Sequence, residues 1–239
     1  MRRFTFIFIA VLTFVISASA QTALLNRAFE TGTRAAQAKE YENAIADYRR
    51  AILFSETEKR SDDFLARIHF NIGVCFYKLK QNAEAVEEFT EAVRLSKGNY
   101  QKAFYALGMA HSELKNWHKA KSAFRKAVEL KPDDGEAWFD LAMVFLVEKD
   151  FDSAKPAFQK SIKYKSAAIA DAHNNIGVIL VLQNNFLLAE NEFKTALTES
   201  NGKSVEAKNN LQFCRLYKRN LNRNLLAKLS FSRKDKQGE

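Results

Sequence analysis

The groups in this sequence that could perform chemistry or bind a metal are histidine, cysteine and acidic side chains, and their spacing matches no catalytic pattern. The histidines and cysteines are His69, His111, His118, His173, Cys75 and Cys214. The sequence contains no H-E-x-x-H, C-x-x-C or glycine-rich phosphate-binding motif. The stretch "KPDDGEA" at 131–137 is similar to a fragment of a calcium loop, but the terminal glutamate is missing, so we interpret it as a turn with Asp at a helix start. The sequence predicts no catalytic residue, no cofactor and no metal site.

The elements that carry these residues are predicted to be helices. Apolar residues make up 47% of the 239-residue chain, which has only two prolines and eight glycines. Long apolar segments with so little Gly and Pro punctuation are typical of helices. Cys75 and Cys214 each lie inside such a segment, and we expect two buried thiols.

The first twenty residues have the three parts of a secretory signal. Two arginines precede an apolar run from Phe4 to Ile16, and "ASA" follows at 18–20. The run is shorter than the ~20 residues that span a bilayer. We therefore expect a signal peptide at 1–20, cleaved after Ala20, and a periplasmic or secreted mature chain. The alternative is an uncleaved signal anchor.

A small residue recurs along the rest of the chain at a period typical of stacked repeats. Each copy is followed by Ala twelve residues later, an aromatic residue four further on, and Ala or Ser three after that. The five markers are Gly32, Gly73, Gly108, Ala142 and Gly177. Successive alanines at the second position are 41, 35, 34 and 35 residues apart.

This spacing predicts pairs of antiparallel helices. Close packing of helices requires small residues where the two axes come closest. The marker glycine would allow contact inside a hairpin, the alanines would allow contact with the next hairpin, and the aromatic ring would fill the gap between. We expect Gly108 and Ala120 to be packing residues of this kind.

The pattern resembles the tetratricopeptide repeat family. It is best seen in "AFYALGMAHSELKNWHKAKSAFRKAVELKPDDGEAWFDLAMVF", and five repeats extend over about 26–201. The second repeat starts seven residues late, through two extra helical turns or a looser loop. The resemblance implies an all-α, right-handed superhelical solenoid of five helix-turn-helix repeats at 21–203. A capping helix at 204–230, with Ser204 as N-cap, would cover the last apolar face, and a basic disordered tail would follow at 231–239.

In such solenoids the first helix of each hairpin lines the concave side, where partners bind. The side chains expected there, and not needed for hairpin packing, form apolar columns, which predict a partner groove. The predicted groove residues are Phe70, Val74, Tyr77, Tyr105, Met109, Phe139, Met143 and Val178. Contiguous apolar surface usually marks a partner site. The alternatives are closure by the protein's own tail, by a dimer, or by tight curvature. Some family members clamp a peptide carboxylate with Lys, Asn and Arg, but here only Asn71 and Lys102 match.

Positive charge is concentrated after residue 203. Residues 204–239 hold nine Lys or Arg against three acidic residues, out of a net charge of +9 for the whole chain. The predicted basic-tail residues are Arg215, Lys218, Arg219, Arg223 and Lys228. Export would remove nucleic acid as a partner, which leaves anionic envelope surfaces or acidic proteins. The sequence therefore predicts an exported, non-catalytic scaffold that binds a protein or peptide. The alternative is a self-associating assembly factor of an envelope complex.

Overall fold

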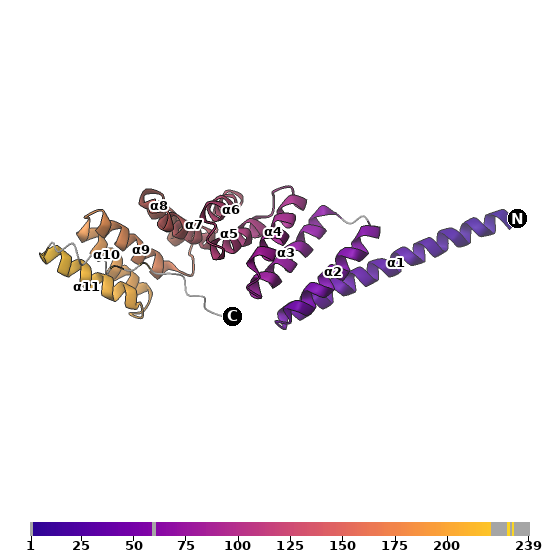
Figure 1. Ribbon diagram of the computed structural model, residues 1–239, viewed down its shortest axis with the longest axis horizontal. Helices are drawn as coiled ribbons and strands as arrows, with labels where there is room; N and C mark the ends of the chain where they lie inside the picture. Colours follow the sequence, from indigo (N-terminus) through magenta and orange to yellow (C-terminus); the bar gives the residue numbers. More distant parts are fainter. Residues whose placement is uncertain (1, 59–60, 221–228, 230, 232–239) are drawn as a thin grey trace. The chain divides into compact units, whose positions relative to one another are not determined.

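The computed structural model consists of helices joined by short connections in the part of the chain that it describes, which omits residues 1, 59–60, 221–228, 230 and 232–239 (Figure 1). No strand occurs among the described residues. The helices are α1 (Arg2–Gln37), α2 (Tyr41–Glu58), α3 (Asp62–Lys78), α4 (Asn82–Leu95), α5 (Gln101–Glu113), α6 (Trp117–Leu130), α7 (Gly135–Val147), α8 (Phe151–Lys163), α9 (Ile169–Leu182), α10 (Phe186–Glu199) and α11 (Val205–Asn220). The all-α prediction is confirmed.

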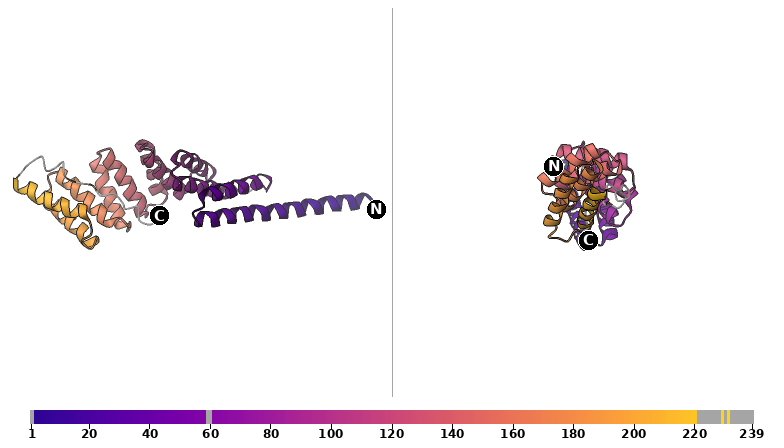
Figure 2. Two further views of the ribbon diagram at one scale, coloured as in Figure 1. Left: turned by 60° about the horizontal axis from the view of Figure 1, so that its bottom comes forward. Right: turned by 90° about the vertical axis from the view of Figure 1, so that its left-hand side faces the viewer.

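The helices form two compact units, 1–116 and 117–239, which we call the N-terminal and the C-terminal unit. In the N-terminal unit α1 packs on α2 and α3 on α4, and in the C-terminal unit α7 packs on α8 and α9 on α10 (Figure 2). These pairs are the antiparallel hairpins that the repeat predicts. The helices of the remaining pair, α5 and α6, belong to different units, so the packing role of Gly108 against the next helix stays a prediction.

The marker glycines lie where the two helices of a hairpin pack against each other, as the repeat predicts. A β-carbon built on Gly73 would lie 2.6 Å from a ring carbon of Phe89, and one built on Gly177 would lie 2.6 Å from a ring carbon of Phe193. At Gly32 the corresponding contact is 2.9 Å, to Tyr48. In all three hairpins the ring comes sixteen residues after the glycine and lies in the space that a side chain would need. The predicted glycine–aromatic packing is therefore confirmed within these hairpins.

Several local predictions are also confirmed. The Ser204 hydroxyl accepts a hydrogen bond from the Ala207 N–H at 3.2 Å and caps α11, and Asp134 caps α7 through the Ala137 N–H at 3.1 Å. Cys75 and Cys214 are both buried. Burial raises the pKa of Cys75 to about 11, which keeps it a neutral thiol.

Two boundaries differ from, or refine, what the sequence predicts. The late start of the second repeat is partly explained by α2, which has 18 residues where α4, α6 and α10 have 14. The capping helix was expected to reach residue 230, but Leu229 is not helical, and α11 is described only to Asn220. Residues 221–228 lie outside the described residues.

The first helix of each hairpin is followed by a lysine or asparagine in the left-handed backbone conformation, a place where glycine is usual. After the first helices of the hairpins these residues are Lys39, Lys80, Lys115, Lys149 and Asn184. At Lys149 φ is 60°, and the Asp150 N–H closes the end of α7 by donating to the Phe145 carbonyl at 2.9 Å. A β-carbon is disfavoured in this conformation.

We predict that Lys149→Gly stabilises the C-terminal unit by ~0.5–1 kcal/mol, because it relieves the left-handed strain with no loss of a packed contact. Lys126→Gly, in the exposed interior of α6, is the matched control and should destabilise by about 1 kcal/mol. Urea titrations followed by circular dichroism measure both. A loss of stability in both variants would show that the strain at Lys149 is negligible.

Candidate functional site

The predicted groove residues of the N-terminal unit form a half-buried apolar surface on two helices. We call this surface the apolar column, and its residues are Phe70, Val74 and Tyr77 on α3 and Tyr105 and Met109 on α5. The spacing of 70, 74 and 77 places them on one helix face. Each keeps part of its side chain accessible while the rest packs on the helices beneath.

Contacts within the N-terminal unit fix the orientation of the apolar column. The Phe70 ring lies 5.8 Å from the Phe89 ring and 5.1 Å from the Tyr100 ring, between centroids. The Tyr77 hydroxyl donates to the Glu113 carboxylate on α5 at 3.4 Å. These contacts make the column a preformed surface.

A polar hollow of about 790 Å³ lies beside the Phe70–Tyr100 ring pair. Its lining includes Asp62, Arg67 and Lys97, together with Tyr100 itself. The N-terminal unit therefore offers an apolar strip next to charged groups of both signs, a combination suited to recognising a peptide with apolar and charged side chains.

In the C-terminal unit the predicted groove residues are more deeply buried. Phe139 on α7 is 0% exposed, and Val178 on α9 is 1% exposed, whereas Met143 is half-buried. The Phe139 ring packs edge-on against Phe158 of α8, with 5.4 Å between centroids. The expectation that Phe139 lies outside the hairpin packing was wrong, because its ring fills the space between α7 and α8. Neither Phe139 nor Val178 presents a free surface.

Three buried asparagines that the sequence analysis did not single out as a group connect α9 to α11. Asn174, Asn175 and Asn210 are all 0% exposed. The Asn210 amide donates to the Asn174 side-chain carbonyl at 2.8 Å, and the Asn174 amide donates to Asn175 at 3.3 Å. Buried amides are stable only when hydrogen-bonded, so this network fixes how α11 sits on α9.

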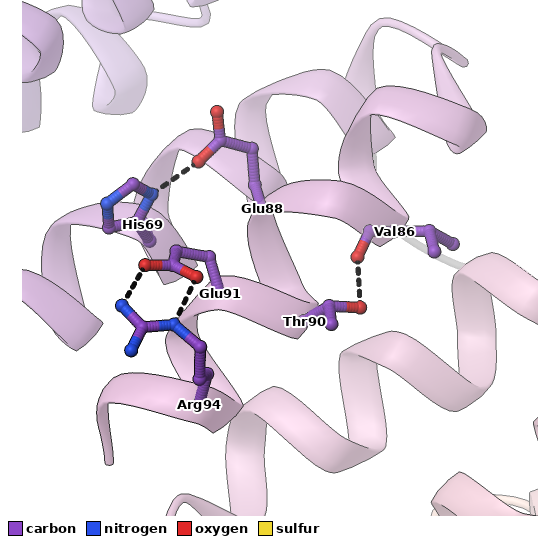
Figure 3. A network of polar contacts seen from close by, with 6 residues as sticks. All are labelled: His69, Val86, Glu88, Thr90, Glu91 and Arg94. Carbon is purple, nitrogen blue, oxygen red and sulfur yellow. Dashed lines mark hydrogen bonds and ion pairs between the residues drawn. The ribbon is translucent and has the colours of Figure 1, made fainter.

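The histidines that occupy equivalent places in two repeats pair with glutamates of the second helix. His69 Nδ1 lies 2.7 Å from Glu88 Oε2, and His173 Nδ1 lies 2.6 Å from Glu192 Oε2. Figure 3 shows the first pair beside Glu91, whose carboxylate accepts from Arg94. This hydrogen bond holds the pKa of Glu91 below its ordinary value. Both histidines are half-buried. Among the described residues no cluster of His, Cys, Asp and Glu could hold a metal ion.

Of the predicted basic-tail residues, Arg215 is bound within the protein. Its guanidinium lies 3.0 Å from Glu190 Oε1 on α10. Lys194 and Arg215 both lower the pKa of Glu190 through hydrogen bonds. Lys218 and Arg219 lie on α11, and Arg223 and Lys228 lie outside the described residues. Arg215 therefore attaches α11 to α10, whereas the anionic-surface role of the others stays a prediction.

Comparison with known proteins agrees with this architecture. Two tetratricopeptide repeat profiles match the chain, one over residues 105–160 and 146–204 and the other over 66–99. Together these matches cover more than half of the sequence. The chain belongs to the tetratricopeptide repeat family.

Similar proteins of known structure share the fold at low identity. A structure of MamA superposes with a TM-score of 0.65 at 20% identity, over 75% of this chain and 93% of that one. A structure of YrrB, described as a TPR protein with an unusual peptide-binding site, gives 0.63 at 23% identity, over 78% and 95%. Human sperm-associated antigen 1 is 31% identical over 115 residues, which are 48% of this chain and 12% of that protein. The chain thus spans only a small part of this relative.

We predict that Phe139→Ala and Phe70→Ala differ in cost although the two residues occupy the same repeat position. Phe139 is fully buried, so its truncation should lower the free energy of unfolding by ~3–5 kcal/mol. Phe70 is half-buried, so Phe70→Ala should lower the free energy of unfolding by less than about half of the Phe139→Ala value. Urea titrations of the two variants measure the difference, and equal losses would contradict the distinction between a core and a surface residue.

Proposed function

We propose that this protein is a non-catalytic scaffold that binds an extended segment of a protein partner on the apolar column. The observation that carries the proposal is the row of half-buried apolar side chains on α3 and α5. On α3 this row lies next to the hairpin contact between Gly73 and Phe89, and the Phe70 ring packs partly on Phe89. Each side chain of the column is only half-buried, and its accessible part would contact the partner.

The chemistry of the column fits a peptide with apolar side chains. Tyr105 offers a large rigid ring, and Met109 offers a flexible, polarisable side chain that adapts to different shapes. Val74 lies between Phe70 and Tyr77 on the same face of α3. The peptide-binding site named for YrrB supports a similar role for this chain.

We further propose that the chain is exported, with a signal peptide at 1–20. The support is the arginine pair, the short apolar run and the "ASA" sequence. Within the described residues, none of the helices combines the length and hydropathy needed to cross a bilayer. Cleavage after Ala20 would leave Leu25 and Ala28, which are buried in α1, to pack on α2.

N-terminal mass spectrometry of the protein from the envelope fraction tests the export proposal. We expect a chain that begins at Gln21, with or without cyclisation of that residue. A mature chain that retains Phe4 to Ile16 would contradict cleavage and favour a signal anchor.

Site-specific photo-crosslinking tests the binding surface. A photoreactive residue at Met109 should crosslink a partner in an envelope extract of the source organism. The same group at Leu53 on α2, which is 63% exposed, should not. Tyr105→Ala should reduce the Met109 crosslink, because truncating an aromatic anchor commonly costs ~2 kcal/mol, about thirty-fold in affinity.

The outcomes separate the proposals. Crosslinks at Leu53 equal to those at Met109 would contradict a role for the column, provided that circular dichroism shows both variants to be folded. A crosslink between two copies of this chain would favour the self-associating assembly factor instead. Light scattering of the purified protein then gives the number of copies.

A further inference from the structure

The same residue at the same repeat position has different exposure in the two units. Val74 on α3 and Val178 on α9 each follow the marker glycine directly. Val74 lies half-buried, whereas Val178 is 1% exposed. Both valines lie on the first helix of a hairpin. In the order of the repeats, α3 lies between the first helices α1 and α5, and α9 lies between α7 and the capping helix α11. The Asn210–Asn174 hydrogen bond holds α11 on α9, so α11 accounts for part of the burial of Val178.

The extra burial extends along the whole face of α9. Asp171, Asn174, Val178 and Val181 follow one another at three- and four-residue spacing and share one helix face. Val181 is 1% exposed, and Leu146 at its repeat position on α7 is 7% exposed, whereas Tyr77 at that position on α3 is half-buried. This pattern indicates that something besides the hairpins covers the inner face of α7 and α9.

Two residues near the C-terminus are suited to be that cover. Leu229 and Phe231 are half-buried although they are not in a helix. An isolated apolar side chain in an irregular segment is half-buried only when it packs on another surface. They alternate with Ser230 and Ser232, so an extended chain would place both apolar side chains on one face and both serines on the other.

The position of α11 brings this segment within reach of α9. Cys214 Sγ lies 3.5 Å from the Phe186 carbonyl at the start of α10, and Arg215 binds Glu190. The part of α11 around 214–215 is thus beside the start of α10, and only 183–185 separate α10 from α9. From Asn220 to Leu229, nine residues can span up to about 30 Å, which is longer than α9.

Charge also favours this placement. Residues 221–239 carry five basic side chains and two acidic ones. Asp171 on α9 and Asp140 on α7 are half-buried acidic residues of the C-terminal unit. A basic segment that lies along this face would gain favourable electrostatic interactions with them.

We propose that the C-terminal segment containing Leu229 and Phe231 binds the inner face of α7 and α9 as an intramolecular ligand. It would restrict partner binding to the apolar column of the N-terminal unit unless a partner displaces it. This inference rests on the proposed function, because a C-terminal segment bound to the first helices of the C-terminal unit would regulate partner binding on the first helices of the repeats.

Thiol labelling of a Val181→Cys variant tests the proposal. The thiol should react slowly with a maleimide in the otherwise unchanged full-length chain, and at least ten-fold faster when Leu229→Asp and Phe231→Asp are added. Ser230→Asp with Ser232→Asp is the matched control, because it adds the same charges on the other face and should leave the thiol protected. Val178→Cys serves as a second reporter if Val181→Cys does not fold. Mass spectrometry assigns each label, and the buried Cys214 of the same unit reports whether the fold is intact.

Equal labelling rates in the Leu229/Phe231 and Ser230/Ser232 variants, with Cys214 protected, would overturn the proposal. Faster labelling upon dilution, together with a dimer in light scattering, would also overturn it, because the segment would then come from a second copy. Neither result bears on the Met109 crosslink in the N-terminal unit, so failure of this inference is distinguishable from failure of the proposed function.

Discussion

The structure depends on the contact between a glycine on the first helix of a hairpin and an aromatic ring on the second. In three hairpins the ring of Tyr48, Phe89 or Phe193 lies so close to the glycine that a β-carbon would come within 2.9 Å. Gly inside a helix costs about 1 kcal/mol relative to Ala, and close packing of the ring offsets this cost. The ring fixes the distance between the helices, and each first helix keeps one more side next to this contact.

That remaining side differs between the two units. In the N-terminal unit it presents the apolar column, held by the contacts of Phe70 and Tyr77. In the C-terminal unit Phe139 and Val178 on this side are buried. Asn174 of α9 is hydrogen-bonded there to Asn210 of α11. A repeat protein in which the same glycine–aromatic contact recurs can thus have one open inner face and one occupied inner face, which is a basis for regulated binding.

The sequence was sufficient for the features that repeat with a fixed period. The marker glycines, the aromatic residues sixteen positions later and the caps Asp134 and Ser204 are local or periodic signals, and the structure confirms them. The sequence could not predict the exposure of Phe139, because equivalent positions have the same residue type in both units and differ only in what covers them. The hydrogen bond from Asn210 to Asn174 could not be predicted either, since it joins residues 36 positions apart. Lysine in the left-handed position at helix ends was missed because glycine is the usual signal there.

A double-mutant cycle between Gly177 and Phe193 tests the central contact most directly. Gly177→Ala should destabilise the protein because its β-carbon meets the Phe193 ring, and the loss should be smaller in a Phe193→Leu background, where the ring is absent. We expect a coupling free energy of about 0.5–3 kcal/mol, the range for residues in contact. Additive effects, within ~0.3–0.5 kcal/mol, would contradict the account, because they would show that the glycine is not there to accommodate the ring.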